Sequence, residues 1–261
     1  MIFRDGLFQG SVIAITGAGT GIGRTTAIAL ASLGADVSLA GRHIGTLQET
    51  ACKVEKLGRK ALVVPTNIRN PEEVNHFAEA TYQHYGKVDV LINNAGGQFI
   101  QNSLNLSPNG WKAVVDLNLN GTFYCCQAFG RMMCQQGHGN IINMSAVVFE
   151  TGSPGMAHSA AARAAVVNLT KTLALELAPS GVRVNCISPG PIASEGFIHE
   201  LPSSQYDETI QRIPLGRMGT LDEAASVIVF LASEASSFMN GEVVIVDGGT
   251  RLRGAMSFLT D

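Results

Sequence analysis

The sequence has no run of lysine or arginine, and this absence excludes one large class of partners. Its 261 residues include 18 basic and 21 acidic side chains, which gives a net charge of −3. A protein that follows the phosphates of a nucleic acid concentrates positive charge on one face or one helix. We therefore expect no nucleic-acid partner, and a small, mostly uncharged molecule fits the composition better.

The sequence also lacks a disulfide framework and a cysteine-based metal motif. Its five cysteines have no disulfide-like spacing, and no CxxC pair stands with histidines at ligand spacing. Reduced, mostly buried thiols in a cytoplasmic protein without a metal site are the expected state.

A long apolar run is missing as well. The N-terminal segment MIFRDGLFQGSVIAITG holds a short apolar run that glycine interrupts and that Arg4 and Asp5 flank. This pattern predicts a strand and neither a signal peptide nor a membrane span. The last residues, SFLTD, match no peroxisomal or endoplasmic-reticulum signal. We expect no membrane partner.

Seven short apolar runs, rich in β-branched residues and bounded by glycine, recur along the chain. Such runs are typical of strands buried on both faces, as in a parallel sheet. They are VIAITG (12–17), ADVSLAG (35–41), ALVVPTN (61–67), VDVLINNAG (88–96), GNIINMS (139–145), VRVNCISPG (182–190) and EVVIVDGG (242–249).

Helical patterns alternate with these runs. They cover Arg24–Gly34, Ile44–Leu57, Pro71–Tyr85, Pro108–Gln136, Gly155–Ala178 and Leu221–Ser233. Asn70 and Ser107, each followed by proline, are helix caps by pattern. The alternation predicts an α/β fold: a single doubly wound domain over residues 1–261, with a seven-stranded parallel sheet and helices on both faces.

A glycine-rich turn, TGAGTGIG (16–23), follows the first expected strand and opens a helix. Glycines let the backbone turn tightly and approach a pyrophosphate, whose charge then lies among the free amides of the helix N-terminus. This context predicts a dinucleotide site of the Rossmann type. The expected cofactor contacts in this turn are Gly17, Thr20, Gly21, Ile22 and Gly23.

The second expected strand ends at Gly41-Arg42-His43, without an acidic residue at its tip. A carboxylate at this place accepts a hydrogen bond from a ribose hydroxyl, whereas an arginine compensates a 2′-phosphate. Arg42 therefore favours NADP(H) over NAD(H).

Together with the segments NNAG (93–96) and LNLNGTF (117–123), the glycine-rich turn resembles the short-chain dehydrogenase/reductase superfamily from Gly10 to about Gly249. This resemblance implies a nicotinamide cofactor and assigns further contacts to it. The adenine would lie between residues near the third strand, and the nicotinamide carboxamide near the segment after the sixth. The implied contacts are Asn67, Ile68, Asn94, Ala95, Gly96, Arg163, Pro189, Gly190, Ile192 and Ser194.

The resemblance also locates the chemical end, and there the sequence departs from the family pattern. Members that reduce carbonyls use an asparagine, a serine, a tyrosine and a lysine. The family spacing puts Asn118, Ala146, Ser159 and Arg163 at these places, with Ser145 just before the second. A serine hydroxyl is a much poorer proton donor than a phenol, and arginine stays protonated. Carbonyl reduction by the tyrosine mechanism is therefore not expected.

Two groups within the superfamily are more similar. The segments GGQF (96–99) and HSAAARAAVVNLTKTLALEL (158–177) resemble peroxisomal trans-2-enoyl-CoA reductases, and FETGSPG (149–155) and GPIASEGF (190–197) resemble 2,4-dienoyl-CoA reductases. Both groups send hydride from NADPH to a carbon–carbon double bond conjugated to a thioester. The resemblance implies an acyl-CoA-like substrate. In the dienoyl register the tyrosine place falls on Val148, so neither register supplies this acid.

The interpretation of the altered site has alternatives. Asn118, with the hydroxyl of Ser159 or Ser145, would donate to an enolate oxygen, Arg163 would hold the ribose, and water would protonate carbon. His158 is a second candidate proton source. Alternatively, the chain is a dinucleotide sensor or scaffold without catalysis, or it reduces another acceptor such as an iminium or a carbonyl.

The resemblance finally implies a mobile substrate lid over about residues 194–214, with Phe197, Ile198 and Leu201 available to cover an acyl chain. Arg212, Arg217 and Arg251 are basic residues available near the mouth. Family members pair through two long helices, and by resemblance we expect a homotetramer.

Overall fold

The computed structural model describes residues 3–200 and 206–252 of the chain. A single sheet of seven parallel strands forms its centre, in the order β3-β2-β1-β4-β5-β6-β7. The strands are β1 (Val12–Thr16), β2 (Asp36–Gly41), β3 (Ala61–Pro65), β4 (Val90–Asn93), β5 (Gly139–Met144), β6 (Val182–Pro189) and β7 (Val243–Val246). Each of the seven expected apolar runs contains one of them.

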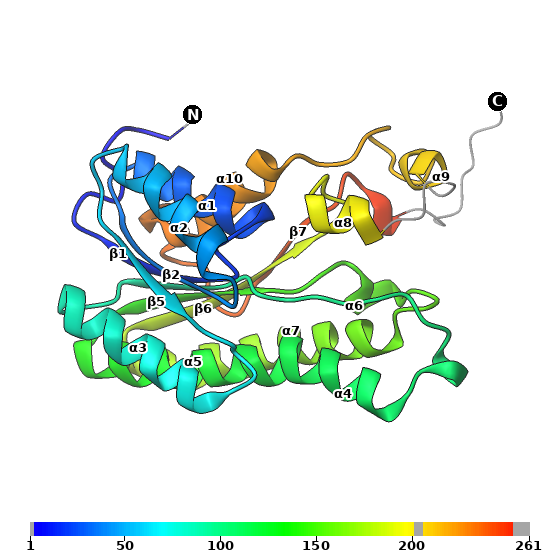
Figure 1. Cartoon of the computed structure of the whole chain (residues 1–261), viewed down its shortest axis with the longest axis horizontal. Coiled ribbons are helices and arrows are strands. Elements are labelled where there is room, and N and C mark those ends of the chain that lie inside the picture. The colour runs from blue at the N-terminus through cyan, green and yellow to red at the C-terminus, as the bar shows by residue number, and fades with distance from the viewer. Residues whose placement is uncertain (1–2, 201–205, 253–261) are drawn as a thin grey trace.

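Helices cover both faces of the sheet (Figure 1). On one face lie α1 (Gly21–Ser32), α2 (Ile44–Glu55) and α10 (Leu221–Ala232). On the other lie α3 (Pro71–Tyr85), α4 (Pro108–Val115), α5 (Gly121–Gln136) and α7 (Ala157–Leu177). No helix of the described residues has the length and apolar character needed to cross a membrane. The predicted doubly wound α/β fold is confirmed.

Each face of the sheet carries its own apolar core. Ile13, Ile15 and Leu39 belong to the core beneath α1, α2 and α10, while Leu91 and Phe129 belong to the core over α3, α5 and α7. The parallel strands are buried on both faces because helices cover both of them. This burial accounts for the continuous apolar runs of the sequence.

The expected helix caps are present. The side chain of Asn70 accepts a hydrogen bond from the backbone N of Glu72 at 2.9 Å, and that of Ser107 accepts one from Gly110 at 3.0 Å. Gly86 ends α3 in the left-handed conformation, with φ at 75°. These local signals fix the ends of α3 and the start of α4.

The helix expected over Pro108–Gln136 contains an irregular turn. Between α4 and α5, residues Asp116–Asn120 form a π-helical turn, and Asn118 lies within it. Such a turn inserts one residue into the helical repeat and is frequent at functional sites. It changes the direction in which the following side chains point, which a regular helical pattern does not predict.

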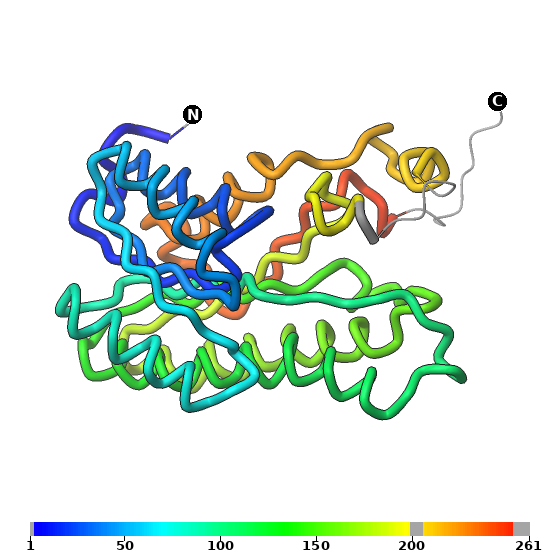
Figure 2. Tube along the Cα trace, viewed as in Figure 1, coloured from blue at the N-terminus to red at the C-terminus, as the bar shows by residue number. Residues whose placement is uncertain are grey.

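Short helices follow the strands that end near the site. They are α6 (Val148–Thr151) after β5, α8 (Glu195–Glu200) and α9 (Tyr206–Gln211) after β6, and a 3-10 turn, Thr250–Leu252, after β7. Figure 2 shows the chain after β6 and the chain after β7 side by side, and the backbone N of Leu215 donates to the carbonyl of Gly248 at 3.3 Å. The expected lid thus contains α8 and α9, and Leu201 lies outside the described residues.

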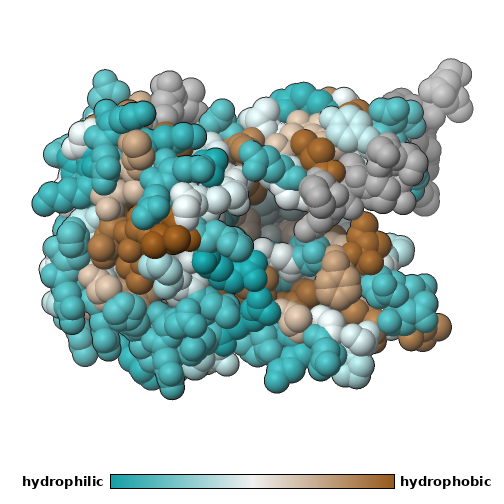
Figure 3. All heavy atoms as spheres, in the orientation of Figure 1, coloured by the Kyte–Doolittle hydropathy of each residue, from teal (hydrophilic) through white to brown (hydrophobic). Residues whose placement is uncertain are grey.

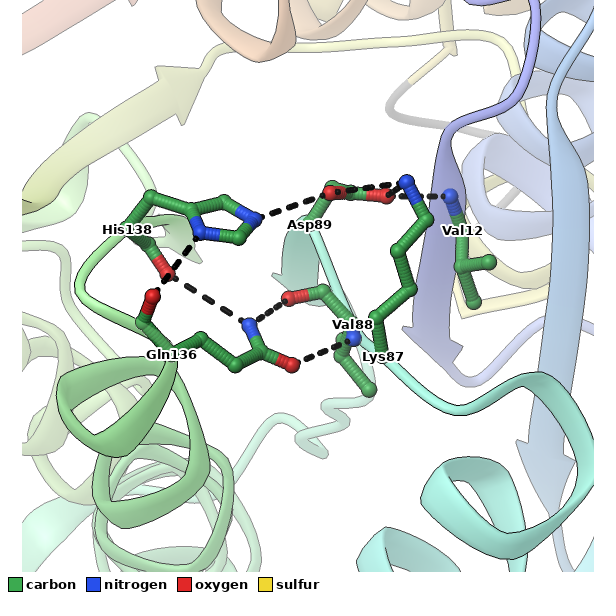
Figure 4. A network of polar contacts seen from close by, with 6 residues as sticks. All are labelled: Val12, Lys87, Val88, Asp89, Gln136 and His138. Atoms are coloured by element: carbon green, nitrogen blue, oxygen red, sulfur yellow. Dashed lines mark hydrogen bonds and ion pairs between the residues drawn. The ribbon is translucent and has the colours of Figure 1, made fainter.

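A polar network fastens the opposite, amino-terminal ends of the strands (Figure 4). The carboxylate of Asp89 accepts from the backbone N of Val12 at 2.7 Å, and it pairs with Lys87 at 3.0 Å and with His138 at 3.2 Å. Beside it, the side-chain amide of Gln136 bonds both the N and the O of Val88. This network joins β1, the start of β4 and the entry to β5.

Replacing Asp89 with alanine is expected to destabilise the fold without touching the cavity at the other end of the strands. The change leaves the backbone N of Val12, a buried residue, without its acceptor, which costs about 1–3 kcal/mol. Urea denaturation measures the loss. Glu79→Ala removes a negative charge from the exposed side of α3 and should change the unfolding free energy by less than about 0.5 kcal/mol. Equal stability of the two variants would contradict this role of Asp89.

Candidate functional site

A cavity of about 1030 Å³ lies at the carboxyl ends of the strands, where the space-filling view shows the molecule hollowed (Figure 3). The strand order reverses between β1 and β4, which continue into the two loops at its centre. In doubly wound sheets, ligands bind in the crevice at this point. Segments from residue 17 to residue 250 contribute to its walls.

The glycine-rich turn between β1 and α1 forms one wall. Gly17 has φ at +66°, and a Cβ there would lie 2.9 Å from the Cα of Ala95. A Cβ on Gly23 would overlap the carbonyl of Gly17. Asn94 fixes the turn, because its Nδ2 donates to the carbonyls of Thr16 at 3.0 Å and Gly17 at 3.2 Å. The backbone is therefore exposed as a cradle that only glycine permits.

Most of the predicted cofactor contacts meet at this cavity. Those in its wall are Gly17, Thr20, Gly21, Ile22, Arg42, Asn67, Ile68, Asn94, Ala95, Gly96, Arg163, Pro189, Gly190, Ile192 and Ser194. Gly23 is buried beneath the turn and does not line the cavity. Glycine is needed at this position for packing, because α1 approaches the backbone of Gly17 too closely for a Cβ.

Arg42 lies at the end of β2 as an exposed side chain. Among the described lining residues, the only acid is Glu195, which belongs to α8 on the other side of the cavity. Neighbouring lining residues are His43 and Thr46. Among the described lining residues, this end of the cavity therefore has the positive charge of Arg42 and no carboxylate.

At the chemical end, the structure brings together three of the four predicted catalytic residues. Ser145, Ser159 and Arg163 line the cavity, with Ala146 beside the first. Asn118 does not line it. Ser145 directly follows β5, and Ser159 and Arg163 belong to the first two turns of α7. The end of β5 and the start of α7 lie side by side here.

The side chain of Asn118 is fully buried and directed at the loop after β4. Its Oδ1 accepts from the backbone N of Gly97 at 3.0 Å, and its Nδ2 donates to the carbonyl of the same residue at 2.9 Å. Both ends of the amide are thus engaged. The side chain braces the loop that carries Gly96 and Gly97, and the expected donation from Asn118 to a substrate oxygen stays a prediction.

Ser145 is also engaged. Its hydroxyl donates to the backbone carbonyl of Arg163 at 3.1 Å, which ties the end of β5 to α7. Arg163 in turn donates through Nη1 to the carbonyl of Met144, and a Cβ on Gly96 would overlap its Nη2. Burial lowers the pKa of Arg163 to about 10, so the guanidinium remains charged at neutral pH.

Ser159 differs from Ser145 in having no partner. Its side chain is buried, and its Oγ makes no hydrogen bond with any described residue. The Nε of Arg163 is also without a partner. Buried polar atoms are nearly always paired in folded proteins, so unpaired ones in the wall of a cavity are available to a bound ligand or water. These two atoms and the glycine cradle are compatible with a bound nicotinamide dinucleotide.

His158 lies next to Ser159 and is fully buried. Its Nδ1 accepts from the backbone N of Ser159 at 2.8 Å, and its ring packs edge-on against Phe99 at 4.6 Å. Burial lowers the pKa of His158, which favours the neutral imidazole. His158 is not among the residues of the cavity wall, so it is poorly placed as a proton source.

The mouth contains residues that the sequence motifs did not reveal. Met156, Thr209 and Thr250 line the cavity, and Thr250 directly follows the glycine pair after β7. The rule that ligands meet the carboxyl ends of parallel strands could have identified Thr250. Phe197 of the expected lid also contributes to the wall, whereas Ile198 is 45% exposed and is not part of it.

All three arginines named for the mouth are paired with acids. Arg251, in the 3-10 turn after β7, pairs with Glu150 of α6 at 3.2 Å. Arg212 pairs with Glu208, and Arg217 with Glu223. These pairs are exposed and contribute little to stability. Because each arginine is paired with an acid, these pairs reduce the net positive charge that is available to a phosphate-bearing substrate.

Comparison with known proteins agrees with this geometry. A family described as enoyl-(acyl carrier protein) reductase matches residues 17–251. A probable 2,4-dienoyl-CoA reductase of Bacillus subtilis is 38% identical over 91% of this chain and 95% of its own. A 3-oxoacyl-(acyl-carrier-protein) reductase of Thermotoga maritima is 37% identical over 92% of this chain and 98% of its own.

Solved structures give the same result. A citronellol catabolism dehydrogenase of Pseudomonas aeruginosa superposes with a TM-score of 0.86 at 37% identity, over 96% of this chain and 98% of its own. The matched span includes the glycine cradle, the loop braced by Asn118 and the start of α7. The chain therefore belongs to the short-chain dehydrogenase/reductase family, whose members use a nicotinamide dinucleotide cofactor.

Proposed function

We propose that this oxidoreductase uses NADPH to reduce an activated carbon–carbon double bond, in an enoyl-CoA or dienoyl-CoA thioester. One observation carries the proposal: Ser159 and Arg163, which by resemblance stand in place of the family's tyrosine and lysine, both line the cavity. None of the chain's four tyrosines is a described lining residue of the cavity. A ketone reduction needs an acid at the carbonyl oxygen, whereas an enolate needs mainly stabilisation.

The names of the relatives support this reaction class. The Bacillus subtilis relative is called a probable dienoyl-CoA reductase, and a Danio rerio relative, 35% identical over 97% of this chain, is called a peroxisomal 2,4-dienoyl-CoA reductase. The Thermotoga maritima relative, in contrast, is named for a carbonyl substrate. The altered residues at the chemical end favour the first class.

The proposed cofactor is NADPH, which supplies the hydride when bound. The glycine cradle would hold its pyrophosphate, and Ile192 and Ser194 would meet the nicotinamide carboxamide. Arg42 would compensate the 2′-phosphate, because it is the charged side chain at the end of β2 and no acid lines that end among the described residues.

The residues at the chemical end would act by position and charge. Asn118 holds the loop at Gly97, Ser145 anchors α7 to β5, and Arg163 provides a buried positive charge. The free hydroxyl of Ser159 is the donor available to the acceptor's oxygen. No residue is assigned as the acid, so the proton added to carbon would come from water.

The cofactor assignment predicts a preference that calorimetry measures. The wild-type protein should bind NADPH more tightly than NADH, and Arg42→Ala should weaken NADPH binding at least about tenfold, because a charged contact to phosphate is worth about 1.5–3 kcal/mol. NADH binding should be almost unchanged. Lys53→Ala, which removes an exposed positive charge from α2 outside the cavity, is the control. If Arg42→Ala bound NADPH as tightly as the wild-type protein does, the assignment would be refuted.

The reaction assignment predicts turnover with a series of 2-enoyl-CoA esters, followed as loss of NADPH absorbance. Ser159→Ala removes the free hydroxyl and should lower kcat/KM about 10- to 100-fold, since one preorganised donor to a developing oxyanion is worth a few kcal/mol. Ser103→Ala, on an exposed turn, should retain wild-type activity.

The alternatives make different predictions in the same assay. A dinucleotide sensor binds NADPH tightly but oxidises none of the enoyl esters. Reduction of an iminium or a carbonyl gives turnover only when such a compound replaces the ester. Absence of turnover with every enoyl ester, in protein that binds NADPH, contradicts the proposed reaction.

We also propose a homotetramer in the cytoplasm. Exposed apolar side chains on the outer helices support association: Phe123 of α5 is 38% exposed and Leu175 of α7 is 79% exposed. Light scattering should give four times the chain mass of 27.5 kDa. Leu175→Asp should shift the protein to a smaller species, because it places a charge in an apolar contact. A monomeric wild type would contradict the proposal.

A further inference from the structure

A chain of buried polar side chains links the ends of β4 and β5 to the middle of α7. Asn93 of β4, Asn143 of β5 and Thr170 of α7 are each at most 2% exposed. The Nδ2 of Asn93 donates to the Oδ1 of Asn143 at 2.9 Å, and the Nδ2 of Asn143 donates to the Oγ1 of Thr170 at 3.0 Å. The hydroxyl of Thr170 donates in turn to the carbonyl of Val166 at 2.9 Å.

The direction of these hydrogen bonds follows from the groups themselves. A carbonyl only accepts, so the single proton of the Thr170 hydroxyl goes to Val166 and its oxygen must accept from an amide N–H of Asn143. The oxygen of the Asn143 amide then faces Asn93. The Sγ of Cys126 lies 3.2 Å from Nδ2 of Asn93, and it is a neutral thiol because burial raises its pKa to about 12. A side chain without a hydroxyl at residue 170 would therefore deprive a buried amide of its acceptor.

This chain lies next to the contacts that hold Arg163. Asn143 directly precedes Met144, whose carbonyl accepts from Nη1 of Arg163. Thr170 follows Arg163 on α7 by seven residues, which is about two helical turns, so both side chains point to the same face of the helix. The helix is thus bonded to β5 near Arg163 and again two turns later. Two such points fix both the height and the rotation of α7 against the strand.

We infer that Thr170 is a positioning residue for Arg163. With Asn143 it fixes α7 against β5, and it thereby fixes the guanidinium in the wall of the cavity. The inference rests on the proposed function, in which Arg163 belongs to the site of the nicotinamide cofactor. Thr170 is not among the described residues of the cavity wall, so its effect on the cofactor passes through Arg163.

Substitutions at residue 170 separate the hydroxyl from the packing. Thr170→Val keeps the branched shape and should weaken the binding of NADPH and of NADH at least about threefold, which corresponds to one lost hydrogen bond. Thr170→Ser keeps the hydroxyl and should retain the wild-type affinity. Both cofactors contain the same nicotinamide ribose, so the result does not depend on Arg42. Calorimetry measures the affinities, and Thr170→Ala replaces Thr170→Val if the latter does not fold.

Thr81 of α3 provides a matched control. It is fully buried, its hydroxyl donates to the carbonyl of Phe77 at 2.7 Å, and it bonds the hydroxyl of Ser38 of β2 at 2.7 Å. Neither Thr81 nor Ser38 is a described lining residue of the cavity. Thr81→Val should lower the unfolding free energy in urea about as much as Thr170→Val does, but it should leave cofactor binding unchanged. An equal loss of affinity in both variants would assign the effect to general destabilisation and overturn the inference.

A double-mutant cycle tests whether the effect passes through Arg163. In Arg163→Met the guanidinium is absent, so adding Thr170→Val should cause no further loss of NADPH affinity. Losses that multiply would show that Thr170 acts independently of Arg163 and would contradict the inference. Wild-type affinity in Arg163→Met would contradict it as well. Circular dichroism verifies that each variant is folded.

Failure of this inference and failure of the proposed reaction are distinguishable, because cofactor binding is measured without turnover. A loss of affinity in Thr170→Val that disappears in the Arg163→Met background supports the positioning role even if no enoyl ester is reduced. Turnover of enoyl esters together with unchanged cofactor binding in Thr170→Val supports the reductase and rejects the positioning role.

Discussion

The contact between the Arg163 guanidinium and the ends of β4 and β5 organises the chemical end of this protein. Nη1 bonds the carbonyl of Met144, and the rest of the group lies so close to Gly96 that no Cβ fits there. A second hydrogen bond links the same two segments, because the hydroxyl of Ser145 donates to the carbonyl of Arg163. The start of α7, and with it Ser159, therefore has a fixed place relative to the sheet. A longer or shorter side chain at residue 163 would change all of these contacts together.

The loop after β4 depends on a second brace. Asn118 bonds both backbone groups of Gly97 and comes from a π-helical turn, which directs its side chain into the interior. Gly96 and Gly97 thereby become a fixed part of the cavity wall. Arg163 and Asn118 approach Gly96 from α7 and from the π-helical turn, so close packing requires glycine at this position. The polar network around Asp89 fastens the other ends of the strands, away from the chemistry.

Much of the fold could be predicted from sequence because its signals are local. Continuous apolar runs identify strands that are buried on both faces, and Asn70, Ser107 and Gly86 mark helix ends through their own hydrogen bonds or conformation. The glycine-rich turn is recognisable for the same reason, since a Cβ at Gly17 or Gly23 collides with backbone nearby.

The state of the chemical end could not be predicted in this way. Spacing placed Asn118, Ser145, Ser159 and Arg163 in one neighbourhood, but it could not indicate which polar atoms were already bonded. Asn118 bonds the backbone of Gly97, and Ser145 bonds the carbonyl of Arg163, whereas the hydroxyl of Ser159 has no partner among the described residues. These are tertiary contacts between distant segments, and residue spacing along one element has no information about them.

The position of a transferred hydrogen tests the proposed reaction most directly. The protein is supplied with a 2-enoyl-CoA ester, NADPH deuterated on the face that delivers hydride, and ordinary water, and the product is examined by NMR and mass spectrometry. Reduction by this site places deuterium on the β-carbon and a solvent hydrogen on the α-carbon, which leaves the thioester carbonyl intact. Deuterium on a carbinol carbon would show carbonyl reduction instead and would contradict the proposed role of Ser159 and Arg163.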